Sequence, residues 1–211
     1  MHIAPKHFGQ AGLATLTLFA ATQASAHHPM GGQTPETFWQ GMLSGIGHPV
    51  IGLDHLAFIV IVGLLAFALG SRAGRLIVPG VFALATVGGA LAHVQAATLP
   101  MVETVVALSV LLGGLLVAAR VELSTLLLSL GVAGFGLFHG FAYGAAIIGA
   151  ESTPLVAYLG SFALTQFALI AGIAFGLTAL AARSERLPRV IQGTGAAAAV
   201  GGGALLAFNL A

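Results

Sequence analysis

The sequence contains no cysteine and few charged residues. Without cysteine in its 211 residues, the chain cannot form disulfides, thiolate zinc sites, iron–sulfur clusters or thiol nucleophiles. Charged residues make up 6% of the chain and hydrophobic residues 58%, whereas soluble domains carry roughly 25% charged residues. So little polar surface predicts that lipid surrounds most of the protein. The formal net charge of +1 comes without a basic patch, which argues against nucleic acid as a partner.

The N-terminal segment has the parts of an export signal. Lys6 precedes an apolar run at 12–21, which is too short for a hydrocarbon core that needs about 20 apolar residues. Small residues at 24–26 then fit the pattern after which signal peptidase cleaves. We therefore predict a cleavable signal peptide at 1–26 and a periplasmic N-terminal segment at 27–47. A short retained helix is the alternative.

Long uncharged runs predict an all-α polytopic membrane bundle of about six transmembrane helices over residues 48–211. The expected spans are 48–70, 76–98, 101–119, 123–149, 155–182 and 190–210. All six arginines after residue 26 fall in alternate loops between these spans, and the positive-inside rule makes those loops cytoplasmic. The mature N-terminus is then periplasmic, in agreement with the export signal. We therefore expect a multi-pass protein of the inner membrane.

Small residues predict close helix contacts at two places. Gly136, Gly140 and Gly144 recur at every fourth position, and such a stripe lets another helix backbone approach closely. We assign that contact to the first span, and we expect Tyr143 to hydrogen-bond to His139 one turn away. The glycines at 201–203 predict similar packing for the last span.

Six ionisable side chains lie within the expected spans or at their edges. They are His48, Asp54, His55, His93, Glu103 and His139. Each costs at least ~2.5–3.5 kcal/mol to insert into a bilayer, and the predicted topology places all six in its outer half. His48 and His55 are seven residues apart, which puts them on one helix face. Imidazole with carboxylate suits nickel, cobalt, zinc, copper(II) or iron, and ligand type alone does not choose among these metals.

Each of these residues also has a structural interpretation. A buried histidine often hydrogen-bonds between helices, which fits His93 well. Asp54 could orient His55 instead of binding metal, and Glu103 could be solvated near the interface. The mature chain would begin with His27 and His28. These two could gather metal at the entrance, or they could be incidental to the cleavage site.

Two motifs resemble the HupE/UreJ family of nickel permeases. The segment 48–55, HPVIGLDH, fits a histidine, five residues and then Asp-His, and the segment 138–144, FHGFAYG, fits Phe-His-Gly followed by small positions. This resemblance covers the whole mature chain. It implies metal uptake for hydrogenase or urease, with His48, Asp54, His55 and His139 as binding or transit residues. Nickel or cobalt would be a substrate, so no resident cofactor is expected.

Other functions fit the sequence less well. The segment 159–162, LGSF, lacks the second glycine of a Gly-x-Ser-Gly protease motif, and no His-Glu-x-x-His motif is present. We therefore expect no enzyme. The alternative is a non-transporting membrane protein that binds metal or delivers it to a partner. The sequence leaves open whether the chain forms a homo-oligomer, how transport is energised and where the inner gate lies.

Overall fold

The computed structural model describes residues 33–211, and in this part of the chain the fold is entirely helical. The predicted signal peptide at 1–26, with His27 and His28, lies outside the described residues. The elements are α2 (Phe38–Ile51), α3 (Leu53–Ala68), α4 (Gly74–Val94), α5 (Val102–Ala118), α6 (Thr125–Gly144), the short 3-10 helix η1 (Ala145–Ile147), α7 (Ser152–Ala181) and α8 (Leu187–Leu210). The prediction of an all-α bundle is confirmed for this region.

The helices differ in length more than the sequence predicted. Four segments are long and apolar enough to cross a bilayer: α4, α6 together with η1, α7 and α8. The pair α2 and α3 would make a fifth span, but its two helices meet at a bend of 75°. Helix α5 is apolar but only 17 residues long. By length and composition the described residues therefore hold four or five candidate spans, and the six predicted spans are not confirmed.

The first predicted span, 48–70, is broken at Gly52. Helix α2 begins at Phe38, within the segment predicted as an N-terminal extension, because Thr37 and Gln40 form a capping box there. Gly52 then has an extended backbone (φ −69°, ψ 104°) and separates α2 from α3. Pro49 in the last turn of α2 has no N–H to donate. The break therefore lies inside the first motif itself.

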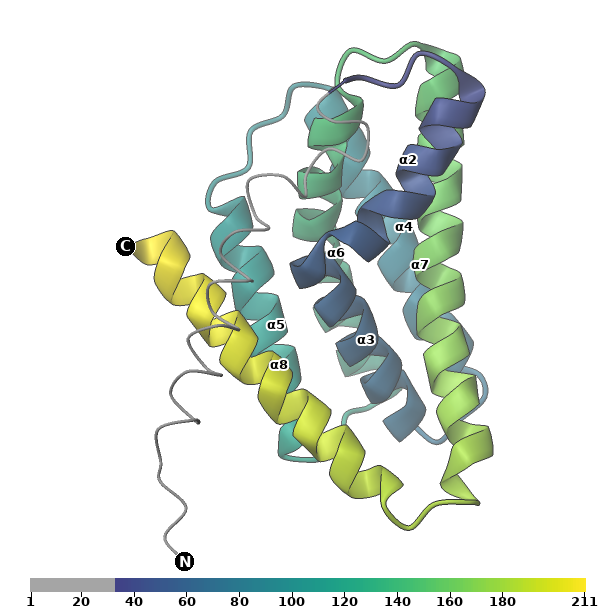
Figure 1. The fold of residues 1–211 in the computed structure, drawn as a ribbon, viewed down its shortest axis with the longest axis vertical. Helices are drawn as coiled ribbons and strands as arrows, with labels where there is room; N and C mark the ends of the chain where they lie inside the picture. Colours follow the sequence, from purple (N-terminus) through teal and green to yellow (C-terminus); the bar gives the residue numbers. More distant parts are fainter. Residues whose placement is uncertain (1–32) are drawn as a thin grey trace, which may run out of the picture.

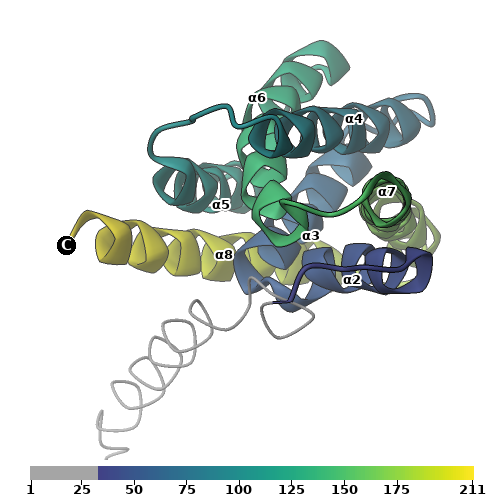
Figure 2. The same cartoon turned by 90° about the horizontal axis from the view of Figure 1, so that it is seen from above.

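Helix α3 lies in the middle of the bundle, with α2 beside α7, α4 beside α6 and α5 beside α8 (Figures 1 and 2). The glycine stripe of α6 packs against α4, not against the first span as we expected. A Cβ on Gly140 would collide with the backbone of Thr86, and one on Gly89 of α4 would collide with the backbone carbonyl of Leu137. Glycines on both helices therefore allow a contact between backbones that the sequence of α6 alone could not assign.

Helix α8 uses small residues in the way the sequence predicted. Gly202 lies against the backbone of α5 at Leu111, and Gly195 lies against Ala118, where a Cβ would come within 2.7 Å of the backbone nitrogen. Of the three glycines at 201–203, only Gly202 makes such a close backbone approach. The last span is therefore held mainly by α5.

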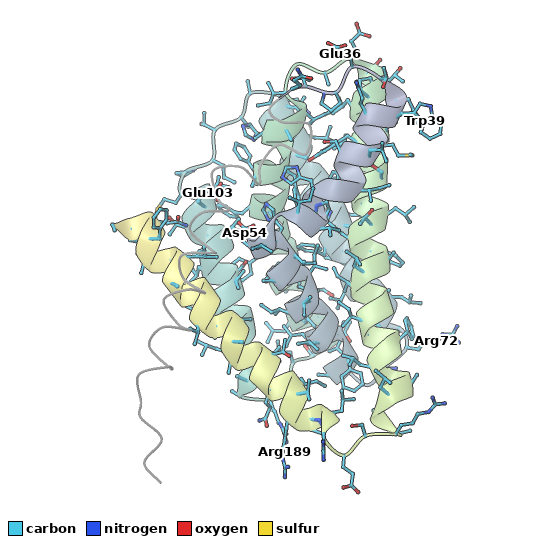
Figure 3. All side chains as sticks on the ribbon, in the orientation of Figure 1. Glu36, Trp39, Asp54, Arg72, Glu103 and Arg189 are labelled. Atoms are coloured by element: carbon cyan, nitrogen blue, oxygen red, sulfur yellow. The ribbon has the colours of Figure 1, made fainter. Side chains whose placement is uncertain are left out.

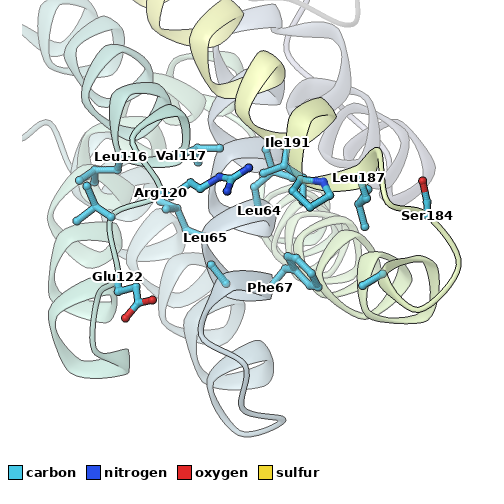
Figure 4. A pocket seen from close by; sticks show the side chains of 14 residues that line it. Leu64, Leu65, Phe67, Leu116, Val117, Arg120, Glu122, Ser184, Leu187 and Ile191 are labelled. Atoms are coloured by element: carbon cyan, nitrogen blue, oxygen red, sulfur yellow. The ribbon is translucent and has the colours of Figure 1, made fainter.

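The two ends of the bundle differ in charge. Arg72 and Arg189 lie at one end, and Glu36 and the exposed Trp39 lie at the other (Figure 3). The remaining arginines of the described chain also lie near the ends of α5 and α7 or the starts of α4 and α8. The arginine-rich end contains a cavity of about 320 Å³ between α3, α5 and α8, with Arg120 and Glu122 in its lining (Figure 4).

Candidate metal-binding site

Two histidines from the separate motifs meet in the core. His55 is in the first turn of α3 and His139 is in α6, and they are only 1% and 0% exposed. Their Nδ1 atoms are 2.8 Å apart. The ring of Phe58 stacks on that of His139, with centroids 4.6 Å apart and planes at 13°. The folded chain therefore joins the two sequence motifs through a direct contact between imidazoles.

The partners of His139 define which nitrogen carries the proton. Ser109 Oγ on α5 lies 2.8 Å from His139 Nε2 and donates its hydrogen to the carbonyl oxygen of Val106 at 2.6 Å. A hydroxyl has one proton, so His139 Nε2 donates to Ser109. For a neutral ring, Nδ1 of His139 is then an acceptor, and His55 Nδ1 donates to it. An ion that bound both Nδ1 atoms would have to replace this proton, because a metal binds only an unprotonated ring nitrogen.

His48 joins this cluster from the last turn of α2. Its ring is 1% exposed and lies 5.9 Å from the ring of His55, measured between centroids. The break at Gly52 lies between the two histidines, and their rings lie close together across it.

Tyr158 of α7 holds the ring of His48. Its hydroxyl lies 2.9 Å from His48 Nδ1 and donates to the carbonyl oxygen of Tyr143, also at 2.9 Å. Because that single proton goes to the carbonyl, His48 Nδ1 donates to Tyr158. Tyr158 thus fixes the orientation and the tautomer of this imidazole.

Asp54 lies beside the histidines and is 6% exposed. Its Oδ1 accepts a hydrogen bond of 2.8 Å from the backbone N–H of His55. A carboxylate in the first turn of a helix also interacts favourably with the helix dipole. Asp54 in addition lines a groove of about 760 Å³ between α3, α5 and α8. The Asp54 side chain therefore contacts the backbone of His55 and also lines this apolar groove.

His93 and Glu103 have other surroundings. The ring of His93 stacks on Phe141 at 4.0 Å and 7°, and its Nδ1 lies 2.6 Å from the carbonyl oxygen of Phe141. This is the interhelical packing role that the sequence left open. Glu103 is exposed in the first turn of α5. Within residues 33–211, no three His, Asp or Glu side chains come close enough to hold a metal ion together.

Comparison with known proteins identifies the family. The sequence model of a family described as HupE / UreJ protein matches residues 14–205, which include both motifs. The chain belongs to the HupE/UreJ family. It is 36% identical over 167 residues to Protein HupE of Rhizobium leguminosarum bv. viciae, covering 79% of this chain and 84% of that protein. No solved structure matches the chain. The family resemblance of the two motifs is confirmed.

Sequence reasoning missed two polar residues that contact the histidines of this HupE/UreJ protein. They are Ser109 and Tyr158, both 0% exposed. The chain has only two tyrosines, and both lie at this cluster, which was the available signal. The expected bond from Tyr143 to His139 is wrong, because the partners of His139 are His55 and Ser109. Tyr143 instead contacts the rings of His48 and His55.

Proposed function

We propose that this HupE/UreJ protein is a permease that imports Ni²⁺, with Co²⁺ as the other candidate, across the bacterial inner membrane. In this proposal the arginine-rich end is cytoplasmic and the N-terminal end of α2 is periplasmic. The observation that carries it is the buried contact between His55 and His139. Histidine is rare inside membrane helices and marks ion pathways when it occurs there.

The separation of the two imidazole nitrogens supports a shared ion. Two nitrogens bound at a right angle by bonds of about 2.05 Å lie about 2.9 Å apart, close to the 2.8 Å between His55 Nδ1 and His139 Nδ1. An ion that replaces the shared proton would therefore require rotation of the rings but little movement of α3 and α6. Right-angled coordination by nitrogen and oxygen is typical of nickel(II) and copper(II).

The broken helix supports transport over a purely structural role for the histidines. In many transporters the substrate site lies where a membrane helix is interrupted, because helix ends and freed backbone groups can face the ion there. Here the interruption at Gly52 lies between His48 and the Asp54-His55 pair. The carboxylate of Asp54 would offset part of the charge of a divalent ion that loses water in the core.

Accumulation of radioactive nickel in cells at limiting metal tests the proposal. Cells without their own high-affinity nickel uptake would carry the wild-type protein, His139→Gln or His93→Gln, with membrane abundance measured by immunoblot. His93→Gln is the matched control, because this histidine packs on Phe141. We expect accumulation with the wild type and the control, and its loss in His139→Gln at equal abundance. No accumulation with the wild type would refute import, and metal binding without accumulation would instead identify a non-transporting accessory protein.

A further inference from the structure

Tyr143 has a hydroxyl group that the fold does not explain. Its side chain is 0% exposed, and its Oη has no hydrogen-bond partner among the described residues. The other tyrosine, Tyr158, lies in the same region, but its hydroxyl contacts both His48 and a backbone carbonyl. Leaving a buried hydroxyl without a partner lowers stability, because the group loses its bonds to water and gains none in return. Phenylalanine would fill the same space without that cost.

The position of Tyr143 connects this hydroxyl with the histidine cluster. Its ring centroid lies 4.3 Å from that of His55 and 4.9 Å from that of His48, and Phe162 closes another side at 5.4 Å. Tyr143 is therefore in contact with both histidines of the first motif. The ring and the hydroxyl can have separate roles here: the ring packs, and the hydroxyl is available to something that enters the cluster.

A divalent ion in this cluster needs oxygen contacts beyond the His, Asp and Glu side chains. No three of those side chains in residues 33–211 can hold an ion together, so an ion among them would keep part of its water. Water bound to a divalent cation is a strong hydrogen-bond donor, and the other two hydroxyls at the cluster, those of Ser109 and Tyr158, already contact a histidine and a backbone carbonyl. A neutral hydroxyl satisfies such a water without a further fixed charge, so that binding stays weak enough for release.

We propose that the Tyr143 hydroxyl is a substrate contact that accepts a hydrogen bond from a water molecule bound to the transported divalent cation. This role rests on the proposed function, because it requires an ion at the histidine cluster. The Tyr143 hydroxyl then contributes to the affinity for the metal ion separately from the histidines of the two motifs. It also accounts for a polar group that otherwise only destabilises the fold.

Tyr143→Phe separates this role from a structural one, because the two roles predict opposite effects on stability. The variant would be purified in detergent beside the wild type and Tyr158→Phe, with NiCl₂ affinity measured by calorimetry and stability by thermal melting. We expect Tyr143→Phe to melt at or above the wild-type temperature and to bind Ni²⁺ about tenfold more weakly or worse, the loss typical of one hydrogen bond to a charged group. Tyr158→Phe should melt at a lower temperature, because its hydroxyl is bonded.

Two results would overturn the proposal. Wild-type affinity in Tyr143→Phe would show that the hydroxyl does not contact the hydrated ion. A lower melting temperature or a loss of folded protein in Tyr143→Phe would show that the hydroxyl serves the fold. If the wild type itself binds neither Ni²⁺ nor Co²⁺, the proposed function fails. If the wild type binds metal and Tyr143→Phe binds it equally well, only the role of the Tyr143 hydroxyl fails.

Discussion

Replacing Gly140 by alanine is expected to disrupt the site without removing any group that contacts an ion. The new Cβ would collide with the backbone of Thr86 on α4, where no side chain can rotate away. The two helices must therefore move apart. Overpacking of this kind costs typically 1–3 kcal/mol. Because Gly140 follows His139 directly, a shift of α6 would also stretch the 2.8 Å contact between His139 and His55.

Gly134 provides a matched control on the same helix. It is exposed, and a Cβ at this position would have no neighbour within 4 Å. Gly134→Ala should therefore leave stability unchanged or raise it by up to about 1 kcal/mol through helix propensity. Thermal stability would be measured by size-exclusion chromatography after heating in detergent, together with nickel accumulation. Equal stability of Gly140→Ala and Gly134→Ala would refute the close α4–α6 contact. A destabilised Gly140→Ala with full transport would refute its link to His139.

The remaining predictions concern the histidines and the helix break. In a double-mutant cycle, His55→Ala and His139→Ala should couple by about 0.6 kcal/mol, and by no more than ~1.7 kcal/mol, as for other hydrogen bonds inside membranes; additive losses in thermal stability would contradict the direct contact. Gly52→Ala should reduce nickel accumulation, because its Cβ would lie 2.8 Å from Cδ2 of His55. Gly160→Ala, whose Cβ would have no neighbour within 4 Å, is the control. Equal nickel uptake by the two variants would contradict a role for the backbone at Gly52. Uptake should fall as the external pH drops toward ~6, because a protonated imidazole cannot bind metal; a constant rate at fixed membrane potential would argue against imidazole ligands.

The sequence predicted the helical class and the two motifs because both depend on local signals. Long uncharged runs have few alternatives to helices in lipid, and His48, Asp54, His55 and His139 stand out in so apolar a chain. It did not predict the break at Gly52. A glycine in an apolar run is compatible with a continuous membrane helix, and the Thr37–Gln40 capping box that begins α2 lies in a segment we interpreted as an extension.

The partners of the site could not be predicted, because they depend on which helices pack together. Ser109 and Tyr158 are isolated polar residues in apolar helices, and nothing in their spacing connects them with His139 or His48. The pairing of α6 with α4 required the position of Gly89 as well as the stripe on α6. His93 shows the opposite case. Its depth in the membrane suggested a ligand, but its ring stacks on Phe141, because depth does not determine the direction of a side chain.

The break at Gly52 links the fold to the chemistry. The break lies between His48 and His55, whose ring centroids are 5.9 Å apart across the 75° bend. The same bend places Asp54 in the first turn of α3, where its carboxylate caps the backbone of His55. A change in the bend angle would therefore change the spacing of the imidazoles and the position of the carboxylate together, so one hinge could bind and release an ion.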